Sequence, residues 1–219
     1  MTLAAGPFRS PRHFQNAAEW LHDLGEIPLT RIIFDPWPGT ATEADLLLLV
    51  ERDKRLCELI DGTLVEKPVG LFESLIAANL IIELGAYVKR LGLGAVFGPD
   101  GTFRLQSSGR IRLPDVAFVS KDRLPKAGKA VPVLAPDLAI EVLSESNTRL
   151  EIDQKLKELF QSGTALAWVI DPSSRTVSVH VGASEQAGIL TEADFLDGGA
   201  VVPGFKMPVA DLFTNVPTA

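Results

Sequence analysis

The sequence predicts an α/β (α+β) fold in which a mixed β-sheet is flanked by helices. Short apolar runs between Gly, Pro and Ser turns predict several strands, and an early hairpin predicts antiparallel pairing. A strand, helix, strand succession over residues 138–170 predicts a crossover between parallel strands. A sheet with both kinds of pairing is expected to carry helices on its faces.

Residues 1–40 hold five prolines and show little periodicity. They predict an arm that packs on the body of the protein, with a short helix near residues 14–24. The body is expected to form one domain over residues 41–215. Its first helix should begin after Thr42, because Asp45 stands three residues later, where a capping residue belongs.

The elements of the body follow in order. Residues 56–66 predict a hairpin around the two-residue turn Asp61-Gly62. The strongest helical periodicity covers residues 71–91 and stops at Gly92, a typical C-terminal cap. Further strands are predicted at residues 95–97, 102–105, 114–119, 138–143, 165–170 and 176–181, with an amphipathic helix at 151–162 and a turn-rich remainder that covers one sheet edge.

Composition sets bounds on the kind of protein. The apolar and charged fractions are those of a soluble globular protein, and a net charge of −7 argues against a general nucleic-acid coat protein. No apolar stretch approaches the about 20 residues of a membrane span, and the first residues lack a secretory signal pattern. A single cysteine, Cys57, fits a reducing compartment. We therefore expect a cytoplasmic protein with no membrane partner.

Basic residues are concentrated in one stretch, residues 104–129. It holds seven cations against two aspartates. The stretch is interpreted either as a solvated loop surface or as a surface that a polyanionic substrate approaches.

Two carboxylates interrupt apolar runs and carry the main functional signal. Asp115 stands at the head of one run, and Glu141 lies between Ile140 and Val142 in another. A carboxylate among apolar neighbours is costly to desolvate unless a positive charge compensates it. Two of them on neighbouring strands predict a site for a hard divalent cation, Mg²⁺ or alternatively Mn²⁺. Such an ion can assist hydrolysis of a phosphodiester.

Lys155 is the candidate for an ammonium group near this ion. It borders the apolar stripe of the helix that follows the Glu141 strand, so its ammonium can reach inward, within about 8 Å of the carboxylates. Lys157 lies about 200° around the same helix and should face solvent. The alternative is that Lys155 lies on an exposed face and pairs with Glu151.

Five ordered motifs also resemble the Uma-two family of restriction-type endonucleases, which belongs to the PD-(D/E)XK nuclease superfamily. The resemblance covers about residues 40–213. It implies a restriction-endonuclease-like sheet in the 41–215 domain and Mg²⁺-dependent hydrolysis of DNA. The motifs are Leu56–Glu66, Leu113–Ser120, Ala135–Ser144, Lys155–Gly163 and Trp168–Pro172.

The resemblance also implies roles for individual residues. The two acidic positions of the superfamily fall on Asp115 and Glu141. The usual lysine, two residues after the second acid, is replaced by Leu143, and Lys155 is the family lysine that matches. Glu73, at the start of the long first helix, matches a further acidic position, although a helix N-terminus favours a carboxylate there in any case.

Three functions remain open from the sequence. The first is a metal-dependent DNA endonuclease, for which a homodimer is expected because two strands are cut. The second is a catalytically inactive nuclease-like fold that binds DNA or a protein partner. The third is hydrolysis of another phosphoester. Glu58 also fits a family motif, with pairing across its hairpin as the alternative.

Overall fold

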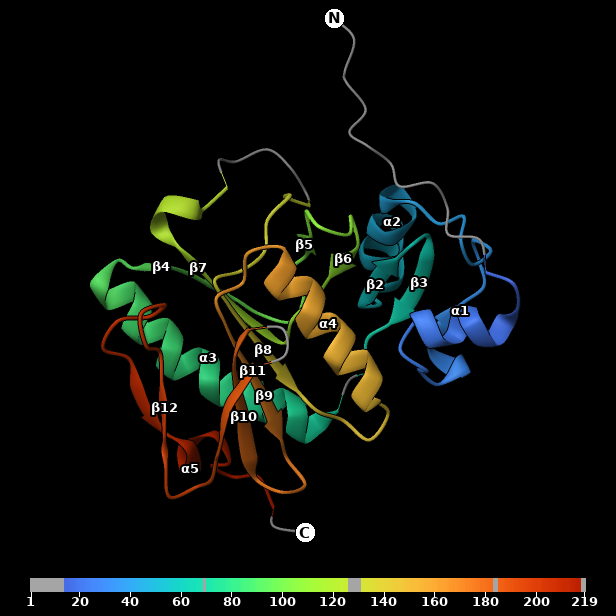
Figure 1. Ribbon diagram of the computed structural model, residues 1–219. Coiled ribbons are helices and arrows are strands. Elements are labelled where there is room, and N and C mark those ends of the chain that lie inside the picture. Colours follow the sequence, from blue (N-terminus) through green and yellow to red (C-terminus); the bar gives the residue numbers. More distant parts are fainter. Residues whose placement is uncertain (1–13, 69, 126–130, 183–184, 218–219) are drawn as a thin grey trace, which may run out of the picture.

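The computed structural model describes residues 14–68, 70–125, 131–182 and 185–217. Two long helices and two larger sheets dominate it (Figure 1). The helices are α1 (Ala17–Asp23), α2 (Glu43–Asp53), α3 (Leu71–Leu91), α4 (Arg149–Gln161) and α5 (Val209–Leu212), with the short 3₁₀ helices η1 (Leu29–Arg31) and η2 (Lys121–Arg123).

The central six-stranded sheet is mixed, as predicted. Its strands run in the order β11-β10-β9-β8-β7-β4. The pair β8 and β9 is parallel and is joined by the crossover helix α4, whereas the other neighbours are antiparallel. The strands are β4 (Gly94–Phe97), β7 (Val116–Ser120), β8 (Leu138–Val142), β9 (Leu166–Asp171), β10 (Thr176–Gly182) and β11 (Glu185–Leu190).

The early strands form a separate sheet, which differs from the single sheet that the sequence suggested. Its order is β1-β3-β2-β6-β5, and the predicted hairpin supplies β2 and β3. Leu59 of the hairpin pairs with Ile111, a residue of a two-residue strand too short to show periodicity. The strands are β1 (Ile32–Ile33), β2 (Cys57–Ile60), β3 (Thr63–Glu66), β5 (Phe103–Arg104) and β6 (Ile111–Arg112).

The segment after β10 is more regular than expected. It adds β11 as an edge strand, then the two-stranded sheet of β12 (Phe195–Asp197) and β13 (Lys206–Pro208), and then α5. The turn-rich composition hides these short strands, although the segment does cover one sheet edge as predicted.

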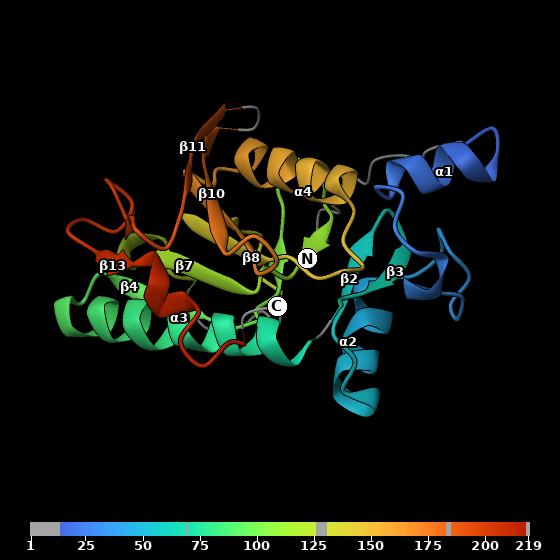
Figure 2. The same ribbon diagram turned by 90° about the horizontal axis from the view of Figure 1, so that it is seen from below.

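Helices α3 and α4 cover opposite faces of the six-stranded sheet (Figure 2). Alternate residues of the strands therefore enter two different cores. On β8, Ile140 packs in the core with α3, and Ala139 packs in the core with α4. The same alternation decides whether a polar residue of a strand points toward α3 or toward α4.

Helix α3 is long and apolar enough to cross a membrane by length and composition alone, with a mean hydropathy of 1.6. One of its faces, however, packs on the sheet through Ile76, Leu80 and Leu84. We interpret α3 as the core helix that the sequence predicts over residues 71–91, and Gly92 is its left-handed C-terminal cap. Thr42 and Asp45 form the predicted capping box at the start of α2.

The described part of the arm lies against the five-stranded sheet and α4. Ile32 and Ile33 form β1, which pairs with β3. The carbonyl of Gly25 accepts a hydrogen bond from the Thr148 hydroxyl at the N-terminus of α4. Because Gly25 has φ +87° and a Cβ there would lie 2.5 Å from the Cα of Glu151, only glycine fits this contact.

Candidate active site

Asp115 and Glu141 lie on neighbouring antiparallel strands. Val116 of β7 pairs with Ile140 of β8, and the N–H of Asp115 donates to the carbonyl of Ile140 at 3.0 Å. This register places Asp115 opposite Glu141. Ala139 on β8 faces α4, so the alternation along the strands turns both carboxylates toward α4 as well.

The Asp115 carboxylate is held by one N–H and one ammonium group. Its Oδ2 accepts a hydrogen bond from the backbone N–H of Val142 at 2.7 Å. Its Oδ1 lies 2.9 Å from Nζ of Lys67, a side chain that is 6% exposed. The Lys67 ammonium also donates to the carbonyl of Leu113 at 2.7 Å. Asp115 is therefore fixed in position by groups from two other strands or strand ends.

Glu141 is buried on β8, and its burial raises the pKa of the carboxyl to about 7. Lys155 lowers this pKa and Asp115 raises it, but burial is the largest influence. Oε1 lies 2.8 Å from Nζ of Lys155, yet it accepts no well-oriented hydrogen bond from the described residues. At Glu141 the effect of burial therefore outweighs that of the nearby Lys155 ammonium.

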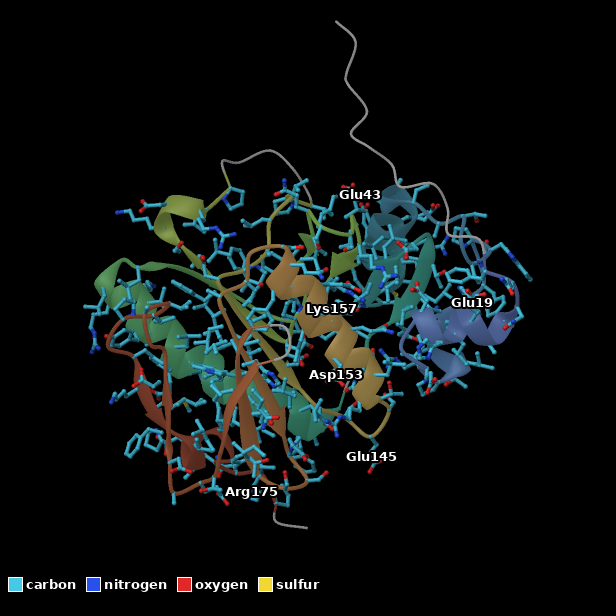
Figure 3. All side chains as sticks on the ribbon, in the orientation of Figure 1. Glu19, Glu43, Glu145, Asp153, Lys157 and Arg175 are labelled. Atoms are coloured by element: carbon cyan, nitrogen blue, oxygen red, sulfur yellow. The ribbon has the colours of Figure 1, made fainter. Side chains whose placement is uncertain are left out.

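Lys155 lies at the distance that the sequence predicts. Its Nζ is 2.8 Å from Oε1 of Glu141 and 2.8 Å from Oε1 of Glu58. Burial alone would lower the pKa of Lys155, but the two carboxylates raise it above its usual range, so the amine is charged. The alternative of an exposed Lys155 paired with Glu151 is wrong, whereas Lys157 is exposed on α4 as predicted (Figure 3).

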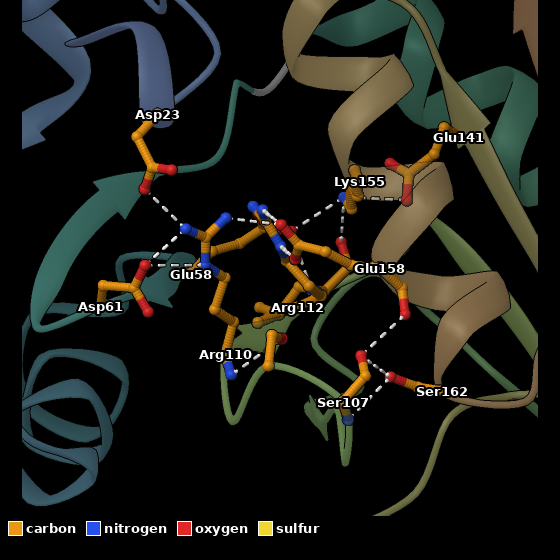
Figure 4. A network of polar contacts seen from close by, with 12 residues as sticks. Asp23, Glu58, Asp61, Ser107, Arg110, Arg112, Glu141, Lys155, Glu158 and Ser162 are labelled. Carbon is orange, nitrogen blue, oxygen red and sulfur yellow. Dashed lines mark hydrogen bonds and ion pairs between the residues drawn. The ribbon is translucent and has the colours of Figure 1, made fainter. Parts of the chain in front are cut away.

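Glu58 connects Lys155 to a buried arginine (Figure 4). Its Oε2 accepts from Nη1 of Arg112 at 2.7 Å, and its Oε1 accepts from the N–H of Leu113 at 2.9 Å. Burial alone would raise the pKa of Glu58, but Lys155 and Arg112 hold it well below its usual range. Pairing only across the hairpin is therefore wrong, because the partners of Glu58 lie beside β6 and on α4.

The network continues from Arg112 toward the arm. Glu158 of α4 accepts from Nε of Arg112 at 2.9 Å and from Nη1 of Arg110 at 2.5 Å. Arg110 also pairs with Asp61 in the hairpin turn and with Asp23 at the end of α1. Figure 4 follows these contacts between elements that are distant in the sequence.

The basic stretch 104–129 is mostly neutralised within the protein, contrary to the expectation of a free cationic surface. Among its described cations, Lys121 is exposed. Lys126 and Lys129 lie outside the described residues. The cations held in ion pairs are Arg104 with Glu43, Arg110 and Arg112 in the buried network, and Arg123 with Asp137.

Glu73 is placed apart from the other candidate residues. It is half-buried in the first turn of α3, and its carboxylate lies beside Gly70 at the N-terminus of its own helix. Within the described part of the chain, no hydrogen bond or ion pair joins it to Asp115 or Glu141. Its position agrees with a carboxylate that stabilises the start of its helix.

A pocket opens beside the two acidic strand residues. One wall comes from the arm, because Arg31 binds Glu151 of α4 in bidentate fashion at 2.7 and 2.9 Å. The pocket is lined by Arg31, Glu58, Lys67, Pro68, Asp115, Glu141, Val142, Asn147, Glu151, Ile152 and Lys155.

The residues of this pocket fit a hard divalent cation that is shared with a substrate. Within the described parts of the chain, no group of three or more His, Cys, Asp and Glu side chains converges as a complete protein-made metal site. Mg²⁺, however, commonly binds through one or two carboxylates, waters and substrate phosphate. Asp115 and Glu141 supply two carboxylates, and Oε1 of Glu141 is a buried oxygen without a hydrogen bond.

Sequence reasoning missed the two other basic residues of the pocket, Lys67 and Arg31. Lys67 directly follows the strand β3. Its position between a strand and Pro68 is the only feature of the sequence that could have indicated a functional lysine. Arg31 lies in the proline-rich arm, whose pattern gives no indication that it reaches α4. Both residues meet partners more than 40 positions away in the chain.

Comparisons with known proteins bear on the whole domain. The Uma2 (Uma-two) family model, described as "Putative restriction endonuclease", matches residues 43–210. No curated protein matches the chain. A crystal structure from Anabaena variabilis ATCC 29413, described as "a putative nuclease belonging to DUF820", has a TM-score of 0.65 and 20% sequence identity. The match covers 72% of this chain and 89% of that one, and it confirms the predicted fold class.

Proposed function

The chain belongs to the Uma2 family of restriction-endonuclease-like proteins, and on that premise we propose that it is a metal-dependent endonuclease acting on DNA. One observation carries the proposal. Asp115, Glu141 and the charged Lys155 converge in one pocket, with Lys155 2.8 Å from Glu141. Two acids and an ammonium group are the residue types that phosphodiester hydrolysis needs.

Asp115 and Glu141 are the proposed ligands of Mg²⁺, with Mn²⁺ as a substitute. When bound, this ion polarises the scissile phosphate and lowers the pKa of a bound water. In hydrolysis the water oxygen forms a bond to phosphorus, one bridging P–O bond breaks, and the leaving oxygen takes a proton.

The chain's own residues hold this arrangement before a substrate binds. Val142 and Lys67 fix the two oxygens of Asp115. Glu58 holds the Lys155 ammonium against Glu141. Preorganised charges of this kind need no reorganisation when negative charge develops on the phosphate.

The alternative is a nuclease-like fold without catalysis that binds DNA or a protein. Leu143, at the usual lysine position of the superfamily, favours this alternative. The ammonium of Lys155 offsets it, because it reaches Glu141 from another element. Hydrolysis of a different phosphoester would use the same residues.

A nicking assay tests the proposal. Supercoiled plasmid is incubated with Mg²⁺ or Mn²⁺ and with wild-type protein, Asp115→Asn, Glu141→Gln or Glu145→Gln. The last removes an exposed carboxylate close in sequence and serves as the matched control (Figure 3). We expect cleavage by wild type and the control only. Full activity in either site variant would refute the assignment, and no cleavage by wild type would favour the inactive fold.

Glu73 is also tested by this assay. We propose a catalytic role for Glu73 on the family resemblance alone. Its place at the start of α3 predicts instead that it only stabilises the helix. Loss of cleavage in a folded Glu73→Gln variant would support a catalytic role, and unchanged cleavage would leave Glu73 as a helix-stabilising residue.

A further inference from the structure

Two lysines reach the pocket, and they differ in how many N–H donors of the ammonium group are engaged by protein oxygens. A lysine ammonium carries three N–H donors. Lys155 has three oxygen neighbours, namely Glu141 at 2.8 Å, Glu58 at 2.8 Å and the carbonyl of Leu113 at 3.4 Å. The Lys155 ammonium is therefore surrounded by three oxygens of the protein itself.

Lys67 has fewer acceptors. Its Nζ lies 2.9 Å from Oδ1 of Asp115 and 2.7 Å from the carbonyl of Leu113. No third acceptor within the described residues is in hydrogen-bond contact with it. One N–H of a buried, pocket-lining ammonium group therefore remains for a group that enters the pocket.

The charge of the pocket indicates what that group is. A phosphodiester that approaches Asp115 and Glu141 meets two carboxylates, whose charge repels it. The charge of Lys155 is engaged by Glu58 and Glu141, and that of Arg31 is engaged by Glu151. Of the two pocket lysines, Lys67 is the one with an N–H donor left over, and an ammonium is a strong donor to a phosphate oxygen.

We propose that Lys67 donates a hydrogen bond to a non-bridging oxygen of the bound phosphodiester, while Lys155 acts as a positioning residue for Glu58 and Glu141. The inference rests on the proposed function, because it assigns the residue that contacts the phosphate in the same pocket. It adds a catalytic residue that lies outside the motifs of the family resemblance.

The backbone around Lys67 supports a fixed position for this donor. The N–H of Lys67 donates to the carbonyl of Leu56 at 2.8 Å, which extends the hairpin ladder by one residue. Pro68 follows and also lines the pocket. The ammonium is thus presented from the end of a strand, as a preorganised site requires.

The test compares Lys67→Met with Lys157→Met, an exposed lysine changed in the same way. DNA binding is measured by fluorescence anisotropy of a short labelled duplex in Ca²⁺, which takes the same oxygen ligands as Mg²⁺. Mn²⁺ binding is measured by calorimetry without DNA, and cleavage is measured with Mg²⁺.

We expect Lys67→Met to weaken DNA binding about tenfold or more and to lower kcat/KM for cleavage about 100-fold. Its Mn²⁺ affinity should stay the same or rise, because the ammonium no longer competes for Asp115. Lys157→Met should match wild type in all three measurements.

Two results would overturn the inference. One is DNA binding and cleavage by Lys67→Met within about threefold of wild type, less than one charged hydrogen bond contributes. The other is a parallel loss of Mn²⁺ affinity, which would mean that Lys67 only holds Asp115. If Lys67→Met does not fold, Lys67→Gln decides by the same readouts, because its two N–H groups can serve Asp115 and Leu113 and leave none for phosphate.

Failure of the inference and failure of the proposed function give different results. Cleavage by wild type that is unchanged in Lys67→Met overturns the inference alone. Binding of DNA that depends on Lys67, without any cleavage, overturns the endonuclease and supports the phosphate contact. Wild-type protein that neither binds nor cleaves DNA overturns both.

Discussion

At the scale of single residues, the chemistry of the pocket is decided by neighbours from distant parts of the chain. Glu141 lies in an apolar strand, and only Lys155 compensates its charge closely. Asp115 has the same strand context but meets a backbone N–H and Lys67. The two carboxylates of one site therefore differ in how completely neighbouring groups compensate their negative charge.

The first prediction concerns metal binding by these two carboxylates. Asp115→Asn and Glu141→Gln should each weaken Mn²⁺ binding at least about tenfold, because each removes a charged oxygen ligand. Isothermal calorimetry of the folded variants measures this, with the exposed Glu145→Gln as control. Wild-type affinity in Glu141→Gln would remove Glu141 from the ligand set.

A second prediction follows from the pKa of Glu141, which burial raises from 4.5 to about 7. A raised pKa means that the metal-free protein loses stability as the pH rises from the unfolded value through the folded one. A divalent cation must bind the ionised form. Mn²⁺ should therefore raise the Tm more at about pH 8 than at about pH 5.5, on either side of this pKa.

Glu141→Gln is the control for this pH dependence. The variant should lose most of the difference between the two pH values, since no carboxyl titrates at that position. An equal Mn²⁺ effect at both pH values in the wild type would contradict the prediction.

Lys155 carries a third prediction, with two consequences. Lys155→Met should lower the cleavage rate about 100-fold. It should also destabilise the fold by about 3–5 kcal/mol, because Glu58 and Glu141 stay buried without their shared partner. Urea unfolding and a cleavage assay at low temperature measure the two effects. Lys157→Met should change neither, and a stable but inactive Lys155→Met would show that its pairing contributes little to the fold.

At the scale of elements, α4 is the part on which the pocket depends most. It carries Lys155 and Glu158 on its inner face, and the arm holds it from outside through Arg31 and Gly25. The family match begins at residue 43, so this clamp comes from residues outside the matched region. The arm therefore supports a site whose acidic residues lie within the matched region.

The clamp leads to a fourth prediction. Arg31→Met should destabilise the protein by about 3 kcal/mol, because it leaves Glu151 buried without its bidentate partner. Adding Glu151→Leu should recover much of the loss, since no unpaired charge then remains. Arg149→Met, which changes a 95% exposed arginine of the same helix, is the control in urea unfolding. Equal stability of Arg31→Met and Arg149→Met would argue against the clamp.

Elements of four or more residues could largely be predicted from the sequence, because their period is visible within the element. The hairpin, α3 and α4 are found within two residues of their predicted bounds. The two-residue strands β1, β5 and β6 exist only through their partners, so their pairing could not be predicted. Asp115 and Lys155 could be predicted for the same reason, because each belongs to a segment with a visible apolar period. Lys67 and Arg31 could not, because their segments show no such period.

At the scale of the whole molecule, a cluster of paired charges is buried between the five-stranded sheet and α4. Arg110 and Arg112 lie there with carboxylates from the hairpin, the arm and α4. Burial of so many ions is favourable only when each is paired with good geometry. Ion pairs therefore link the five-stranded sheet to α4, beside the apolar packing of Phe103 against the six-stranded sheet, and each sheet also has an apolar core of its own.

These ion pairs have a consequence for the life of the protein in a cell. The pocket depends on Glu58 in the first third of the chain and on Lys155 about 100 residues later, and each buried ion is costly without the others. A chain of which only the part before α4 has left the ribosome, or a fragment that ends before α4, lacks Lys155 and cannot assemble them. If the protein cuts DNA, its cutting centre can form only after α4 has been synthesised and has brought Lys155 to Glu58 and Glu141.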